Sequence, residues 1–172
     1  MTPRARILLT LLVVFALMGV EAWRSRRNER GLRRRGAVEP PDDDYRLMQV
    51  LYPLAFLLPA AEGWLHPRAG AVWWMPGAAV FAAGKAIKYW AIAVLGDRWT
   101  FRVLVLPGAP LVRRGPYRLL RHPNYVGVAG EIAGAALLSS GPWTGAVLTL
   151  AFVGVMRRRI HVEERALARW PE

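Results

Sequence analysis

The chain has 172 residues, of which 54% are hydrophobic, and it carries a formal net charge of +12 with no cysteine. The absence of cysteine excludes disulfides, thiolate metal sites and a cysteine nucleophile. High hydrophobicity with high charge is unusual in a soluble domain, but it is typical of membrane proteins in which apolar helices alternate with arginine-rich loops. The arginines lie at the ends of apolar segments and not on a separate basic domain, so we expect no nucleic-acid partner. The length suits one domain over residues 1–172.

The first predicted membrane-spanning helix covers residues 6–23. A hydrocarbon core of about 30 Å needs roughly 20 helical residues, and "RILLTLLVVFALMGVEAW" supplies a run of this kind. A cleaved signal peptide is the alternative, with a weak cleavage site at Val20–Ala22. We favour a retained helix, because cleavage would leave the seven arginines of residues 24–35 outside the cell.

The charged segment after this helix, residues 24–44, contains glycine and proline and lacks an apolar period, which predicts a loop. The second predicted span covers residues 46–65, where Pro53 and Pro59 predict kinks. A short turn then leads to the third predicted span, residues 71–95.

A long polar connection, residues 96–124, follows and includes the short β-like run "FRVLVLPG". The fourth predicted span covers residues 125–139, and the turn "SSGPW" leads to the fifth, residues 143–156. The last span continues as a charged helix through residues 157–167. We therefore expect an all-α, polytopic integral membrane protein with about five transmembrane helices, a cofactor-binding loop and a C-terminal helix.

The distribution of positive charge predicts the orientation. Segments 24–46, 96–124 and 157–172 together hold 19 of the 24 lysines and arginines. Because positive residues are enriched in cytoplasmic loops, we place these segments in the cytoplasm and the N-terminus outside. We therefore expect an inner-membrane protein whose active site faces the cytoplasm.

A polar cluster precedes the fourth span in the stretch "VRRGPYRLLRHPNYVG". Pro116 fixes the backbone in a turn, and Pro123 suits the first turn of a helix, whose free N–H groups attract anions. The cluster offers guanidinium groups for a carboxylate, an imidazole, and an aromatic ring for a cation or a second ring. These groups belong to Arg118, Arg121, His122 and Tyr125.

A second cluster, "RIHVEERAL", follows the fifth span and contains Glu163 and Glu164. The hairpin of the fourth and fifth spans would bring it toward His122. The two glutamates alone would more simply be exposed partners of nearby arginines. A ligand with a carboxylate and cationic groups, such as S-adenosylmethionine, would use both clusters. No Gly-x-Gly-x-x-Gly motif follows a strand, which excludes a Rossmann methyltransferase.

The stretch "LGDRWTFRVLVLPGAPLVRRGPYRLLRHPNYVG", together with "RIHVEERAL", resembles the isoprenylcysteine carboxyl methyltransferase family of membrane enzymes, especially its short bacterial members. The resemblance covers about residues 95–167 and implies methyl transfer from S-adenosylmethionine to a lipidic acceptor. It implies that four residues contact the cofactor: His122, Tyr125, Glu163 and Glu164. It also implies that three residues shape the cofactor loop: Gly115, Pro116 and Tyr117.

The eukaryotic-type members continue past the two glutamates with a Gly-x-x-Tyr-x-x-Tyr segment and a further arginine, which do not follow Glu164 here. The acceptor therefore need not be a prenylcysteine carboxylate. The short bacterial branch resembles enzymes that O-methylate alkylpyrones or related polyketide lipids, and we favour that class. For an enol or phenol acceptor, His122 is a candidate general base.

Ionisable residues inside predicted spans indicate function. Lys85 and Glu131 either pair with each other, which we favour, or line the acceptor pocket. Lys88 is expected to extend toward the membrane surface, and Trp99 is placed at the cofactor mouth. Small residues of the fourth span predict close helix packing. These are Gly127, Gly130 and Gly134.

Two alternatives remain open. A membrane sterol-type reductase using NADPH shares an Arg-His-Pro-Asn-Tyr signature, but that signature usually runs on to Gly-Glu. Here Gly127 is followed by Val128, and the next acid is Glu131. A non-catalytic scaffold would not explain the dense polar cluster. We predict no metal site, and as partners we predict membrane lipids and a hydrophobic or lipidated acceptor. The oligomeric state is not predicted.

Overall fold

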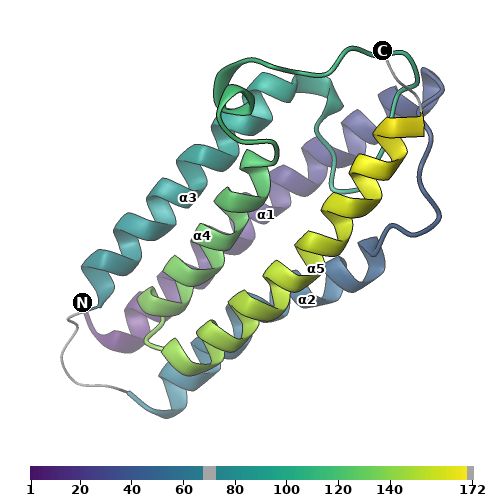
Figure 1. Cartoon of the computed structure of the whole chain (residues 1–172). Helices are drawn as coiled ribbons and strands as arrows, with labels where there is room; N and C mark the ends of the chain where they lie inside the picture. Colours follow the sequence, from purple (N-terminus) through teal and green to yellow (C-terminus); the bar gives the residue numbers. More distant parts are fainter. Residues whose placement is uncertain (68–72, 170–172) are drawn as a thin grey trace.

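The computed structural model describes residues 1–67 and 73–169. The described chain forms a bundle of α-helices that run side by side (Figure 1). The helices are α1 (Pro3–Arg34), α2 (Tyr45–Leu65), α3 (Trp74–Leu95), α4 (Pro123–Leu138) and α5 (Pro142–Arg169). Between α3 and α4 the chain forms two 3-10 turns, η1 (Gly96–Arg98) and η2 (Gly115–Arg118). The all-α prediction is confirmed for these residues, where the β-like run contributes one isolated bridge, Val105 with Val38.

Two described segments have the length and apolar composition of a membrane-spanning helix, Pro3–Arg34 and Trp74–Arg98. These segments contain the first predicted span and residues 74–95 of the third, of which residues 71 and 72 lie outside the described residues. For α2, α4 and α5, membrane crossing stays a prediction. As expected from the sequence, α5 continues without a break through the charged segment that follows its apolar part.

The prediction of a loop directly after the first span was wrong, because α1 continues to Arg34. Arginine and glutamate are good helix formers, and the chain has no proline between the first turn of α1 and Pro40. Contacts with other elements also support the extension, since Asn28 Nδ2 donates to the carbonyl oxygen of Trp99 at 2.8 Å. The helix ends before Gly36, whose φ of 85° lies in the left-handed region that glycine adopts without strain.

The predicted close packing of the fourth span is confirmed, and α3 is its partner. A Cβ atom at Gly134 would lie 2.4 Å from the backbone nitrogen of Phe81. A Cβ atom at Gly127 would lie 2.8 Å from the carbonyl oxygen of Gly84. The two backbones therefore approach closely only because these positions carry no side chain.

We expect Gly134→Ala to destabilise the bundle, because the added methyl group meets backbone atoms that cannot rotate away. Overpacking of this kind costs about 1–3 kcal/mol. Gly154→Ala in α5 is the matched control, since nothing lies within 4 Å of its Cβ position. Unfolding in detergent should show a loss for the first variant and none for the second. Equal stability of the two variants would contradict the close packing of α3 and α4.

A cluster of buried charges lies in the middle of the bundle. Lys88 Nζ lies 2.6 Å from Glu21 Oε2 and 3.3 Å from Glu131 Oε2. Lys85 Nζ lies 2.9 Å from Glu21 Oε1 and 3.2 Å from Glu131 Oε2. The structure thus shows the pair of Lys85 with Glu131 that we favoured. The prediction that Lys88 reaches the membrane surface was wrong, because its side chain is only 1% exposed. We call these four residues the buried charge cluster.

Candidate functional site

The connection between α3 and α4 folds over one end of the bundle, where α1 and α5 carry most of their arginines (Figure 1). We call this the arginine-rich end. The connection is first fixed to α1: Phe101 N donates to Ser25 Oγ at 2.8 Å, beside the bond from Asn28 to Trp99. The polar extension of α1 is therefore what positions the start of the connection.

The loop between α1 and α2 holds the same connection against α5. Val103 N donates to Asp43 Oδ2 at 2.8 Å, and Arg159 Nε lies 3.1 Å from Asp43 Oδ1. Arg159 Nη2 also donates to the carbonyl oxygen of Phe101 at 2.6 Å. Burial raises the pKa of the Asp43 carboxyl, while the Arg159 guanidinium partly opposes the shift. We call Asp43 and Arg159 the clasp. Both side chains are buried where they hold the connection against α5.

The predicted Gly-Pro-Tyr turn is observed as η2. Gly115 has a φ of 56°, and a Cβ atom there would lie 2.7 Å from Val94 Cγ2, so the turn packs tightly on α3. The chain then reaches His122, the N-cap of α4, and Pro123 occupies the first turn as predicted. Proline fits there because the first-turn N–H group has no partner within the helix.

The two predicted polar clusters meet at this point, although they lie far apart in the sequence. His122 Nδ1 lies 3.7 Å from Glu163 Oε2, and His122 Nε2 lies 3.4 Å from Glu164 Oε1. Arg121 Nη1 also lies 3.4 Å from Glu164 Oε1. The ring centroids of His122 and Tyr125 are 5.8 Å apart. The hairpin of α4 and α5 therefore creates one polar site from the two clusters.

The protein changes the titration of Glu163. Removal of water raises the pKa of its carboxyl, and the nearby His122 and Arg159 partly oppose this shift. Tyr117 faces the same carboxylate, and burial followed by the charge of Glu163 raises the pKa of its phenol. Tyr117 therefore stays neutral at physiological pH, and Glu163 takes up a proton at a higher pH than an ordinary glutamate.

Two cavities adjoin at this site. The outer cavity, of about 130 Å³, lies between the connection and the ends of α4 and α5. Five of the predicted residues line it, together with the clasp arginine Arg159. The five are Tyr117, Arg121, His122, Tyr125 and Glu163, and Trp99, the predicted mouth residue, lines it as well.

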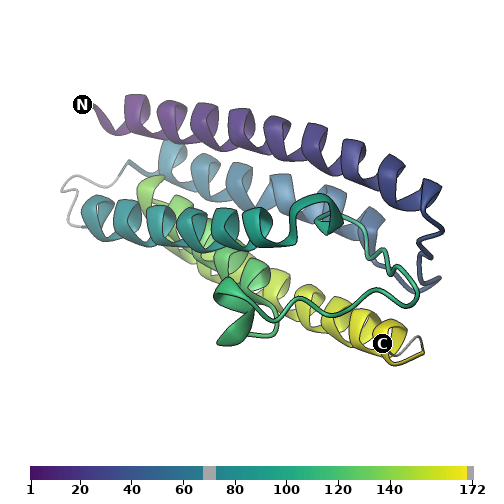
Figure 2. The same ribbon diagram turned by 90° about the horizontal axis from the view of Figure 1, so that it is seen from above.

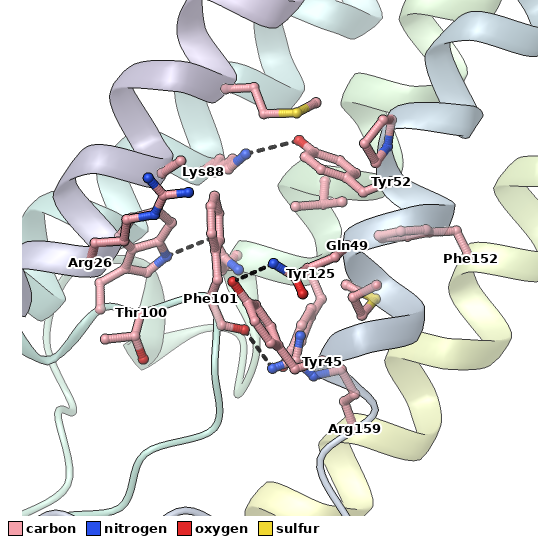
Figure 3. A pocket seen from close by; sticks show the side chains of 17 residues that line it. Arg26, Tyr45, Gln49, Tyr52, Lys88, Thr100, Phe101, Tyr125, Phe152 and Arg159 are labelled. Atoms are coloured by element: carbon pink, nitrogen blue, oxygen red, sulfur yellow. Dashed lines mark hydrogen bonds between the residues drawn. The ribbon is translucent and has the colours of Figure 1, made fainter. Parts of the chain in front are cut away.

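The inner cavity, of about 200 Å³, lies deeper in the bundle (Figure 3). Its walls are largely apolar, and Met48, Val128 and Phe152 contribute to them. One side of the cavity is polar, because Lys88 of the buried charge cluster and Tyr52 both line it, and Lys88 Nζ donates to Tyr52 Oη at 3.1 Å. Trp99 forms part of the boundary between the cavities, and its Nε1 donates to Asn124 Oδ1 at 3.3 Å. Residues that line both cavities are Trp99, Thr100, Asn124, Tyr125 and Arg159.

Other predicted residues lie elsewhere. Gly115 and Pro116 shape η2 but line neither cavity, and Arg118 is exposed. Lys85 and Glu131 belong to the buried charge cluster and do not line the inner cavity. Glu131 contacts two residues that do line it, because Lys88 lies 3.3 Å from its carboxylate and Tyr52 Oη donates to it at 2.8 Å.

Four residues that build the site were not predicted from the sequence. Asn124 lies within the quoted motif, and Arg159 lies in an arginine run that was taken as surface charge. Nothing local distinguishes Asp43 from its acidic neighbours or Tyr52 from the apolar residues of α2. Their roles depend on the packing of helices that are distant in sequence.

The described residues thus form a helical bundle with two helices apolar enough to cross a membrane and a polar cluster beside two cavities at one end. The model of the isoprenylcysteine carboxyl methyltransferase (ICMT) family matches residues 77–169, and the chain belongs to this family. It is also similar to the uncharacterized protein YpbQ of Bacillus subtilis, with 32% identity over 92% of this chain and 95% of the relative. An uncharacterized protein of Haemophilus influenzae shows 27% identity over 54% of each chain. No solved structure matches the chain.

Membership of this family makes the protein a membrane methyltransferase. The family match begins within α3, so α1, α2 and the Asp43 loop lie outside it. The relative YpbQ covers most of the chain, including these elements. The comparisons give no support to an NADPH-dependent reductase.

Proposed function

We propose that the protein transfers a methyl group from S-adenosylmethionine to an oxygen atom of a lipidic acceptor, at the inner face of a bacterial inner membrane. The observation that carries the proposal is the pair of adjoining cavities, one lined in part by charged side chains and one largely apolar, which share a wall at Asn124, Tyr125 and Arg159. A transferase for two dissimilar substrates needs this arrangement, because the two must meet without water between them.

The outer cavity has the chemistry that S-adenosylmethionine requires. The carboxylate of Glu163 suits a cationic group, and Arg121 and His122 suit a carboxylate. The rings of Tyr117 and Tyr125 suit an adenine ring or a sulfonium. When bound there, S-adenosylmethionine would supply an electrophilic methyl group. The volume lies below the roughly 300–1,000 Å³ of common ligand pockets, so the connection between α3 and α4 must move outward to admit it.

The inner cavity suits the acceptor. Its apolar wall would receive the hydrophobic part, and the shared residues Asn124 and Tyr125 would orient the reacting oxygen toward the outer cavity. His122 is then the candidate base for an enol or phenol proton, whereas a carboxylate acceptor needs none. Trp99 and Phe101 would exclude water from the junction. The acceptor class that we favour is an alkylpyrone or related lipid, and a prenylcysteine-like carboxylate is the other.

Ligand binding and labelled transfer test this function together. We expect S-adenosylhomocysteine to raise the unfolding temperature of the detergent-solubilised protein and NADPH to leave it unchanged. We also expect a labelled methyl group from S-adenosylmethionine to enter the organic phase of a bacterial lipid extract. Stabilisation by NADPH alone, or label that stays in the aqueous phase with every extract, would contradict the proposal.

A further inference from the structure

The segment 113–121, which includes η2, carries exposed apolar side chains between arginines. Leu119 is 83% exposed and Leu120 is 42% exposed. Such residues are unfavourable in water when they form a contiguous patch with no partner. The arginines of the segment are Arg113, Arg114, Arg118 and Arg121.

Some arginines at the same end of the bundle form ion pairs, whereas others, such as Arg34 and Arg157, form none within the described residues. Arg33, Arg102 and Arg158 each form an ion pair, with Glu39, Glu39 and Asp44. Arg121 pairs with Glu164, yet its side chain stays 88% exposed.

The remaining three arginines of the segment form no ion pair with any residue of the described ranges. They are Arg113, Arg114 and Arg118, and all three are exposed. Their charge is therefore free to bind an external anion.

The segment lies on the outer side of the bundle. A Cβ atom at Gly115 would lie 3.2 Å from Trp90 Nε1, so η2 packs beside the last turns of α3. Trp90 itself is 52% exposed. The green turn projects from α3 and α4 on the side away from α1 (Figure 2). An exposed tryptophan near a helix end is typical of the membrane–water interface.

The length of α4 sets the depth of this segment. Its 16 residues give a helix of about 24 Å at 1.5 Å per residue, which is shorter than the hydrocarbon core of about 30 Å. If α4 lies at the level of its neighbour α3, its arginine-rich end begins at or inside the membrane surface. Leu119 and Leu120, which directly precede α4, are then held where acyl chains meet headgroups.

From these observations we propose that segment 113–121 docks onto anionic lipid headgroups, with Leu119 and Leu120 inserted among the acyl chains. Guanidinium groups bind phosphate through paired hydrogen bonds, and leucine side chains gain by leaving water. We assign the lipid surface as the partner, because the exposed leucines Leu119 and Leu120 lie among arginines without ion pairs in the described chain and close to the exposed Trp90. The inference does not depend on the proposed methyl transfer.

The chain contains no cysteine, so a single introduced cysteine can carry a spin label. Leu119→Cys is labelled with a nitroxide in lipid nanodiscs of phosphatidylcholine alone or mixed with phosphatidylglycerol. Collision rates with oxygen and with a water-soluble nickel chelate then report depth. Leu150→Cys, on an exposed apolar position of α5, is the membrane control, and Arg165→Cys is the water control.

In mixed nanodiscs, we expect the depth of the Leu119→Cys label to lie between those of the two controls, with nickel collisions several-fold below those of Arg165→Cys. Phosphatidylcholine alone should give a shallower position, and the triple change Arg113→Gln, Arg114→Gln and Arg118→Gln should remove this difference. A label as accessible to nickel as the water control in both bilayers would overturn the docking. If the depth of the label changes neither when phosphatidylglycerol is left out nor when the three arginines are replaced, the role of anionic headgroups would be overturned.

Discussion

Replacing Glu163 with glutamine is expected to weaken binding of S-adenosylhomocysteine at least about tenfold while the helical bundle stays intact. The carboxylate lines the outer cavity, opposite His122 and beside Tyr125. A hydrogen bond to a charged group contributes about 1.5–3 kcal/mol, and a factor of ten corresponds to about 1.4 kcal/mol. Calorimetric titration in detergent would measure the loss.

Glu164→Gln is the matched control for this change. Glu164 contacts Arg121 and His122 but does not line the cavity, and its side chain is 41% exposed. We expect its affinity to fall much less than that of Glu163→Gln. Equal losses in the two variants, or unchanged affinity in both, would remove Glu163 from the donor site.

The raised pKa of Glu163 gives the same residue a pH signature. The donor's cationic group requires the carboxylate, which is present above the folded-state pKa and is lost as the pH falls through it. Because loss of contact with water raises this pKa from the ordinary value of glutamate, affinity for S-adenosylhomocysteine should start to fall at a higher pH than an ordinary glutamate would cause. Glu163→Gln should abolish this part of the pH dependence. A variant that keeps the wild-type profile would show that another group titrates.

The second large effect is expected at the buried charge cluster. Lys88→Met should destabilise the protein by about 3–5 kcal/mol, the range for removing one partner of a buried ion pair. Lys88 is fully surrounded by partners, namely Glu21, Glu131 and the Tyr52 hydroxyl. Without it, two buried carboxylates share one lysine, Lys85. Unfolding in detergent by heat or denaturant measures the loss.

A compensating change separates lost charge balance from lost packing. Adding Glu131→Gln to Lys88→Met restores one lysine against one glutamate, so we expect it to recover a substantial part of the stability. A double variant less stable than Lys88→Met would show that the cluster does not act through its charge balance. Such a result would leave the donor site unaffected, because Lys88 does not line the outer cavity.

The meeting of the two polar clusters could be predicted from the sequence better than the centre of the bundle. The hairpin of α4 and α5 follows from two apolar runs and a short turn, and it is enough to bring His122 toward Glu163. The partner Glu21 was missed because it lies at the end of an apolar run, next to a segment that was interpreted as a loop. Its contact with Lys88 depends on how α1 is rotated against α3, and no local pattern determines that rotation.

The clasp of Asp43 and Arg159 was missed for a similar reason. Each residue lies among neighbours of the same charge, and only the folded loop selects Arg159 for burial behind Phe101. Charge runs were interpreted as solvated surface, which holds for Arg158 but not for Arg159. Tertiary packing, and not composition, decides which member of such a run enters the site.

A structure of the protein bound to S-adenosylhomocysteine tests the central claim most directly. We expect the ligand in the outer cavity, with its amino acid part between His122 and Glu163 and its sulfur facing the wall of Asn124 and Tyr125. A ligand bound at the opposite end of the bundle, or away from both His122 and Glu163, would contradict it.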